Sequence, residues 1–146
     1  MSRNDRLIYL IFTAQQKLRT YIKNTLLKEN VRVTIAQAGI LFLLKQKTGQ
    51  SMSEISQYLS VDNSTLTGLI DRLERSGFVR RNSNPDDRRS LNIDITESGL
   101  RELEKAKVVI RRINEEVKEG FSEQEIESFK KVLQHFTSKF GRPAGD

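Results

Sequence analysis

The sequence has 146 residues, with 25 Lys or Arg against 19 Asp or Glu, which gives a formal net charge of +6. Its length predicts a single domain, and the absence of cysteine excludes disulfides, thiolate metal sites, cysteine nucleophiles and thiol redox switches. No apolar stretch approaches the roughly 18 residues that a membrane-spanning helix needs, so we expect a cytoplasmic protein with no membrane partner.

The N-terminal segment has the periodicity of a long amphipathic helix. Apolar residues recur at intervals of three and four positions, which places them on one face of a helix from about residue 5 to residue 28. The stripe consists of Leu7, Ile11, Ala14, Leu18, Tyr21 and Thr25, and it is widened by Ile8, Leu10, Ile22 and Leu26. Such a face is expected to be covered by a core or by another helix.

Shorter helices are predicted next. Thr34 and Gln37 have the spacing of a helix start, and the run from Ile40 to Leu44 is apolar nearly all round. This pattern predicts a buried helix that ends near Gly49.

The two helices after it are separated by only two residues. Ser51 and Glu54 begin a helix over residues 52–59, and Asp62 or Asn63 begins another, which ends at Ser76-Gly77. The inner face of the second helix consists of Leu66, Leu69, Ile70 and Leu73. Because Ser60 and Val61 alone lie between them, the pair has the spacing of a helix-turn-helix.

The periodicity changes after Gly77. Residues 78–81 can form a strand, residues 82–87 are dense in turn formers, and residues 90–96 alternate between polar and apolar as a half-buried strand does. These segments predict a β-hairpin. A hairpin directly after a helix-turn-helix has the position of a wing.

Residues 98–140 return to helical periodicity. One apolar stripe runs from Leu100 to Val117, and another runs from Ile126 to Phe140 in a helix that opens with a capping box of Ser122 and Glu125. A single chain has too few other surfaces to bury these two apolar stripes and the stripe of residues 5–28. We therefore expect the helices of 5–28 and 98–140 to join two identical chains in a homodimer. The predicted fold is mainly α (α+β), with a winged helix-turn-helix lobe over residues 34–97.

The charge is distributed unevenly. Residues 1–50 carry +7, residues 51–97 carry −2 and residues 98–146 carry +1. The middle segment is not basic by count, but its six basic residues are all arginines between Arg72 and Arg89. Arginine is suited to bidentate contacts with phosphates and bases.

Residues 51–99 carry motifs that resemble the MarR family of bacterial transcription regulators. These motifs are Leu66-Thr67, Asp71-Arg72-Leu73, Gly77-Phe78-Val79, Asp87-Arg88-Arg89 and a strand ending in Thr96 before Glu97-Ser98-Gly99. The flanking helices have the family's lengths and order, so the resemblance covers nearly the whole chain. It implies one MarR-like domain over residues 1–146, which binds a pseudo-palindromic operator in double-stranded DNA as a homodimer.

Small polar side chains lie near the start of the helix that follows residue 62. They are Asn63, Ser64, Thr65 and Thr67, and they can enter a major groove and reach base edges or phosphates. The alternative is that these residues form a solvated face rich in helix-capping side chains. The helix lies between a short helix and a hairpin that carries arginines, and this position favours DNA binding over that alternative. The resemblance places Arg72 against a phosphate or against the wing. Arg75 is expected to pair with Asp71, one turn earlier.

By the same resemblance, Asp87 and Arg89 fall on an Asp-x-Arg wing motif. In that motif the arginine enters a minor groove and the aspartate orients it. Arg88 and Arg89 are otherwise solubilising charges at a hairpin tip. We include Asp87, Arg88 and Arg89 among the candidate DNA-binding residues.

The resemblance also implies repression that is relieved by a small anionic or phenolic ligand. Its cleft is expected between the dimerisation helices and the DNA-binding lobe. The candidate contacts are Lys17, Tyr21, Ile40, Leu44 and Ile110, and Arg19 or Lys23 could also bind an anionic group. These residues are equally well explained as core and solvated cations, because no polar cluster marks a pocket.

No catalytic motif is present. The sequence lacks HExxH, a Gly-rich phosphate loop and Gly-x-Ser-x-Gly, and its single histidine, His135, has no ligand partners nearby. We therefore expect a protein that is not an enzyme and uses no cofactor or metal. The alternative function is a helical module that binds another protein through the winged core.

Overall fold

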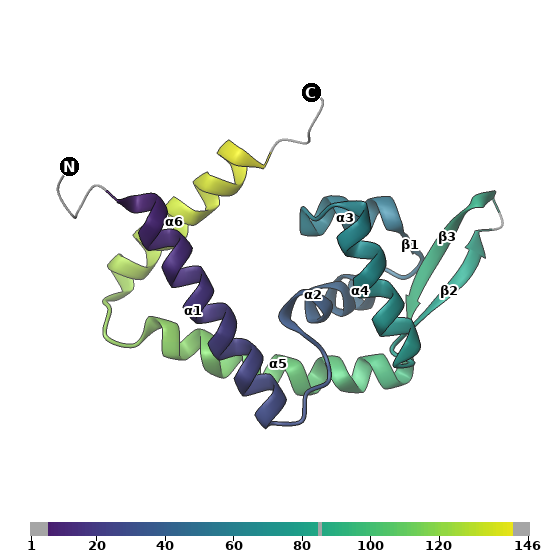
Figure 1. The fold of residues 1–146 in the computed structure, drawn as a ribbon, viewed down its shortest axis with the longest axis horizontal. Coiled ribbons are helices and arrows are strands. Elements are labelled where there is room, and N and C mark those ends of the chain that lie inside the picture. The colour runs from purple at the N-terminus through teal and green to yellow at the C-terminus, as the bar shows by residue number, and fades with distance from the viewer. Residues whose placement is uncertain (1–5, 85, 142–146) are drawn as a thin grey trace. The chain divides into compact units, whose positions relative to one another are not determined.

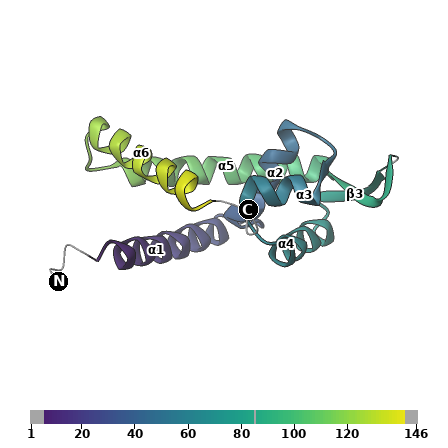
Figure 2. The same ribbon diagram turned by 90° about the horizontal axis from the view of Figure 1, so that it is seen from above.

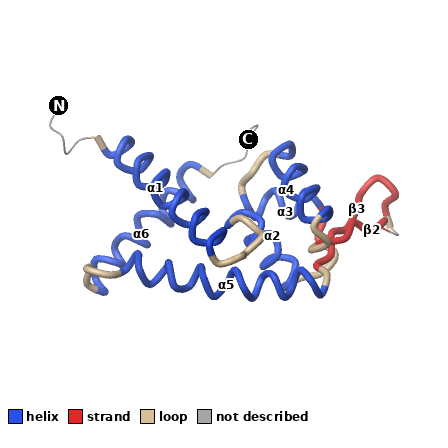
Figure 3. The backbone as a smooth tube through the Cα atoms, turned by 60° about the horizontal axis from the view of Figure 1, so that its bottom comes forward, coloured by secondary structure: helices blue, strands red, loops and turns tan. Residues whose placement is uncertain are grey.

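The computed structural model describes residues 6–84 and 86–141, except for the side chains of residues 84 and 87–90. The elements are α1 (Leu7–Lys28), α2 (Ile35–Gln46), β1 (Gln50–Ser51), α3 (Met52–Leu59), α4 (Asn63–Arg75), β2 (Val79–Asn84), β3 (Asp87–Ile95), α5 (Glu97–Lys118) and α6 (Glu123–Phe140) (Figure 1). Figure 3 shows that helix predominates and that the longer strands form a single hairpin. This arrangement confirms the predicted mainly α fold with a winged helix-turn-helix.

The chain divides into two compact units, Met1–Ile110 and Arg111–Asp146. Within the first unit, α2 contacts α3, α4 and β3, and the hairpin projects away from these helices (Figures 1 and 2). The fully buried side chains at the centre are Ile40, Leu41, Leu44, Ile55, Leu66, Ile70, Leu73, Phe78 and Ile93. The apolar run of α2 is therefore core, as its sequence predicts.

Side-chain caps fix where the helices of this lobe begin. Thr34 and Gln37 form a reciprocal capping box at the start of α2, and Ser51 accepts a hydrogen bond from the backbone N–H of Glu54 at the start of α3. Asp62 caps α4 in the same way. Gly77 follows α4 with φ of +81°, the left-handed conformation expected of a glycine that ends a helix.

The sheet has three antiparallel strands in the order β1-β3-β2. β1 was not predicted, because its two residues carry no periodicity and are defined only by pairing with Ile93 and Asn92 of β3. The predicted turn over residues 82–87 is too long. Pairing continues through Asn82 opposite Asn92 and Ser83 opposite Leu91, with an irregularity after Ser83, so cross-strand hydrogen bonds override the local turn preference of these residues.

The terminal helices have apolar faces that the described chain leaves exposed. In α1 only Ile22 and Leu26 are buried, whereas each residue from Leu7 to Phe12 is between 44% and 79% exposed. In the second unit, α6 begins with the predicted capping box of Ser122 and Glu125 and buries none of its residues. No helix within the described residues combines the length and apolar character that crossing a membrane requires.

Candidate nucleic-acid interface

The first turn of α4 presents an ordered polar surface. Asn63, Ser64, Thr65 and Thr67 are all exposed. Asp62 accepts hydrogen bonds from the backbone N–H of Thr65 (2.7 Å) and from the hydroxyl of Ser64 (2.9 Å). The N–H of Thr65, aided by side-chain hydrogen bonds from Thr65 and Ser64, holds the pKa of Asp62 below its ordinary value of 3.8. The carboxylate thus stays charged and fixes this turn at neutral pH.

The hydroxyl groups on this surface are oriented by internal hydrogen bonds. Ser64 donates to Asp62, and Thr67 donates to the carbonyl oxygen of Asn63 at 2.7 Å. Each hydroxyl oxygen keeps lone pairs that can accept a further hydrogen bond. In a major groove, the donors that match such acceptors are the amino groups of adenine and cytosine.

Gly68 continues the exposed face of α4. A Cβ atom added there would meet nothing within 4 Å. The packing of the chain therefore does not require a glycine at this position, even though glycine weakens a helix interior.

The last turns of α4 carry two exposed arginines, Arg72 and Arg75. Neither forms an ion pair with any residue that the structure describes. The expected pairing of Arg75 with Asp71 is wrong, because Asp71 binds Arg81 of β2 instead. Two cations thus remain available to an external anion.

Arg81 lies on the hairpin face that packs toward α4. Its Nη2 is 2.5 Å from Oδ1 of Asp71, and its Nη1 is 3.2 Å from Oε1 of Glu74. Its backbone N–H also donates to Oε2 of Glu74 at 3.3 Å. Arg81 is not among the site residues predicted from the sequence, although the alternation of a strand could have indicated it, because residues 79 and 81 share a face.

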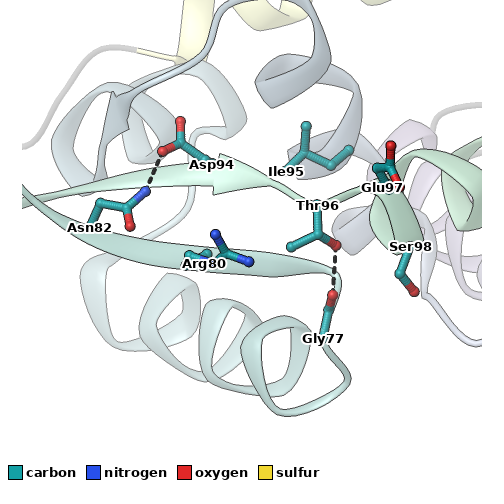
Figure 4. A pocket seen from close by; sticks show the side chains of 8 residues that line it. All are labelled: Gly77, Arg80, Asn82, Asp94, Ile95, Thr96, Glu97 and Ser98. Atoms are coloured by element: carbon teal, nitrogen blue, oxygen red, sulfur yellow. Dashed lines mark hydrogen bonds between the residues drawn. The ribbon is translucent and has the colours of Figure 1, made fainter.

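The opposite face of the hairpin borders an open hollow of about 540 Å³. Figure 4 shows Arg80, Asn82 and Asp94 on this face, together with Thr96, Glu97 and Ser98 at the start of α5. Asp94 accepts hydrogen bonds from the amide of Asn82 (2.5 Å) and from the backbone N–H of Gly49 (2.8 Å). Arg80 lies opposite Asp94 in register and forms no ion pair among the described residues.

Thr96 joins the two ends of the hairpin. Its hydroxyl donates to the carbonyl oxygen of Gly77 at 2.6 Å (Figure 4) and accepts from the N–H of Gly99 at 3.0 Å. Its backbone N–H donates to the carbonyl oxygen of Phe78. The base of the hairpin is thereby tied to α5.

Three of the candidate DNA-binding residues, Asp87, Arg88 and Arg89, lie at the start of β3, and their side chains fall outside the described part of the structure. Among the candidate effector contacts, Ile40 and Leu44 are fully buried, Tyr21 is 46% exposed, Ile110 is half-buried and Lys17 is exposed. The hollow beside the hairpin and a second one on α6 include none of these five residues.

Comparisons with known proteins identify relatives of this chain. A sequence model of the MarR family matches residues 33–91. The HTH-type transcriptional regulator PecS of Dickeya dadantii is 32% identical over 128 residues, which cover 83% of this chain and 69% of PecS. The HTH-type transcriptional repressor IacR of Pseudomonas putida is 26% identical, with 74% of this chain and 65% of IacR covered.

Among solved structures, a mutant MarR from E. coli complexed with operator DNA superposes with a TM-score of 0.81 at 25% identity, covering 90% of this chain and 93% of that chain. The chain spans less than two thirds of some curated relatives: 65% of IacR, and 41% of the regulator YfiV of Bacillus subtilis. MarR-family proteins are transcription regulators and not enzymes, which agrees with the lack of catalytic motifs.

Proposed function

Because the chain belongs to the MarR family, we propose that it regulates transcription by binding a pseudo-palindromic operator in double-stranded DNA as a homodimer. In this proposal α4 enters the major groove and the β2–β3 hairpin reaches the adjacent minor groove. The observation that carries it is the exposed face of α4, where small polar side chains in the capped first turn are followed by Arg72 and Arg75, which form no ion pair among the described residues.

Exposed apolar side chains support association with a second copy. Residues Leu7 to Phe12 of α1 form one such group, and Phe129, Val132, Leu133 and Phe140 of α6 are between 45% and 72% exposed. Contiguous apolar surface of this kind marks interaction sites in soluble proteins. A twofold dimer would present two copies of α4 to half-sites about one helical turn apart, roughly 34–36 Å.

The proposed direction of regulation is repression, relieved by a small anionic or phenolic ligand near Lys17, Tyr21, Ile40, Leu44 and Ile110. The relative IacR, which is named as a repressor, supports the proposal of repression. A ligand lowers DNA affinity only as far as it prefers a dimer whose α4 helices no longer match the groove spacing. Titration of salicylate-like aromatic acids with and without operator tests this part, because equal affinities would show no coupling.

The DNA-binding function is tested by salt titration. Operators are first selected from genomic fragments with the purified protein, and binding is then measured between about 50 and 200 mM salt. Neutralisation of phosphates makes log K fall linearly with log salt, and Arg72→Gln is expected to reduce the magnitude of the slope by about 0.9.

Lys130→Gln serves as the matched control, because it removes the same charge from α6, where Lys130 pairs with Glu127. Its slope should equal that of the unaltered protein. Binding without salt dependence, or an equal effect of both substitutions, would contradict the proposal. The outcome in which no duplex is bound would favour a protein-interaction module instead.

A further inference from the structure

The ion pairs of Arg81 connect the two elements that are proposed to contact DNA. Asp71 and Glu74 lie one turn apart on α4, and Arg81 lies on β2. We propose that Arg81 is a positioning residue, which fixes the hairpin relative to α4 so that both elements meet DNA in one register. The inference rests on the proposed DNA-binding function and assigns a role to a residue within it.

The geometry distinguishes Arg81 from an ordinary surface cation. Isolated surface ion pairs contribute little because solvent screens them and flexible side chains lose entropy. Arg81 instead uses both terminal nitrogens and its backbone N–H to bind two carboxylates, and its side chain is only 24% exposed. A planar guanidinium held at several points is oriented as well as attracted.

The location of Arg81 explains why this restraint matters. Phe78 and Val79, at the base of the hairpin, are buried. Among the described residues, the hydrogen bonds that join α4 to the hairpin beyond Phe78 are those of Arg81. Ser83, two residues further on, is exposed, so without Arg81 the outer part of the ribbon can change its angle to α4.

Engagement by two carboxylates also means that Arg81 does not act as a phosphate contact in this arrangement. Arg80, its neighbour, differs in this respect. It is exposed, belongs to the opposite face of the hairpin and forms no ion pair within the described structure. Arg80→Gln is therefore a matched control, which removes the same charge from the same strand without breaking the contacts to α4.

The first measurement uses the free protein. Because the sequence contains no cysteine, cysteines introduced at the exposed residues Thr67 and Ser83 can be spin-labelled uniquely, and the distance between α4 and the hairpin can be measured by pulsed electron paramagnetic resonance. We expect a narrow distribution in the otherwise unaltered protein, a broad one in Arg81→Gln and a narrow one in Arg80→Gln. Equal widths in Arg81→Gln and Arg80→Gln would overturn the proposal.

The second measurement uses hydroxyl-radical footprints on a selected operator, with Thr67 and Ser83 unchanged. Arg81→Gln is expected to lose protection in the minor groove flanking each half-site, to keep protection where α4 binds, and to bind roughly tenfold more weakly. Loss of both protections together, without broadening of the measured distance, would assign Arg81 to the general stability of the lobe and overturn the proposal.

A second variant distinguishes two roles of Arg81, which are to position the hairpin and to neutralise the negative charge of Asp71 and Glu74. Asp71→Ala/Glu74→Ala breaks the same contacts but removes two negative charges from α4, so positioning predicts loss of the flanking protection here as well. If this variant instead binds more tightly with an unchanged footprint, Arg81 acts only by neutralising Asp71 and Glu74. If the unaltered protein binds no duplex, the proposed function fails, whereas the distance measurement still decides the role of Arg81.

Discussion

A methyl group at position 99 is expected to disrupt the junction between the hairpin and α5. An ideal Cβ on Gly99 would lie 2.2 Å from the carbonyl oxygen of Phe78 and 2.8 Å from Cγ1 of Ile95. Rotation of a surface side chain cannot relieve these contacts, because the nearest atom belongs to the backbone and accepts the N–H of Thr96. Gly99→Ala must therefore move the start of α5 away from the base of the hairpin.

The free energy of unfolding is expected to fall by about 2–4 kcal/mol. Overpacking of a core typically costs roughly 1–3 kcal/mol, and a lost hydrogen bond costs about 1 kcal/mol. The hydrogen bonds at risk are those from Thr96 N–H to Phe78 and from Gly99 N–H to the Thr96 hydroxyl. Urea unfolding followed by circular dichroism, at one fixed protein concentration, measures the change.

Gly68→Ala is the matched control. It also adds one methyl group within a helix, but nothing lies within 4 Å of the added Cβ. Because alanine favours the helix over glycine, we expect stabilisation by about 0.5–1 kcal/mol. Gly99→Ala with the urea midpoint of the unaltered protein would refute the close approach between α5 and Phe78.

Three further variants test the lobe and α6. Asp62→Ala should lower the free energy of unfolding, because it removes the side-chain cap of α4. Since the pKa of Asp62 is lowered from 3.8, urea titrations should show the full difference above that pH and a shrinking difference as the pH falls through the lower pKa of the folded state. Phe129→Glu combined with Phe140→Glu, on the exposed face of α6, should convert a dimer into monomers, which light scattering would detect as a halved mass. A persistent dimer would exclude this face from the dimer interface. Thr67→Ala should weaken operator binding by roughly 1–3 kcal/mol with little effect on random duplex, whereas equal losses would limit Thr67 to phosphate contacts.

Local signals account for the elements that the sequence predicted well. The caps Thr34, Ser51 and Ser122 each act within three residues of the helix that they begin, so their effect is visible in a short window of sequence. The core of α2 follows from an apolar run in the same way. These features define where α2, α3 and α6 begin and why α2 is buried.

Features that depend on partners distant in sequence were missed or misplaced. β1 exists only because Gln50 and Ser51 meet β3, more than 40 residues later in the chain. Asp71 has an arginine four residues away on its own helix, but it binds Arg81 across the hairpin junction. Helix spacing alone could not decide between these two arginines, because the choice depends on how β2 packs against α4.

The acidic residues of the DNA-binding lobe have structural roles that its net charge does not reveal. Residues 51–97 have a net charge of −2, which by count opposes binding to a polyanion. However, Asp62 caps α4, Asp71 and Glu74 bind Arg81, and Asp94 binds Asn82 and Gly49. Asp71 and Glu74 share the positive charge of Arg81, whereas Arg72 and Arg75 are exposed and form no ion pair within the described structure. The net charge of the segment therefore does not show where its cations lie, because the carboxylates on and beside α4 hold the turn and the hairpin while two arginines of the same helix stay open to an external anion.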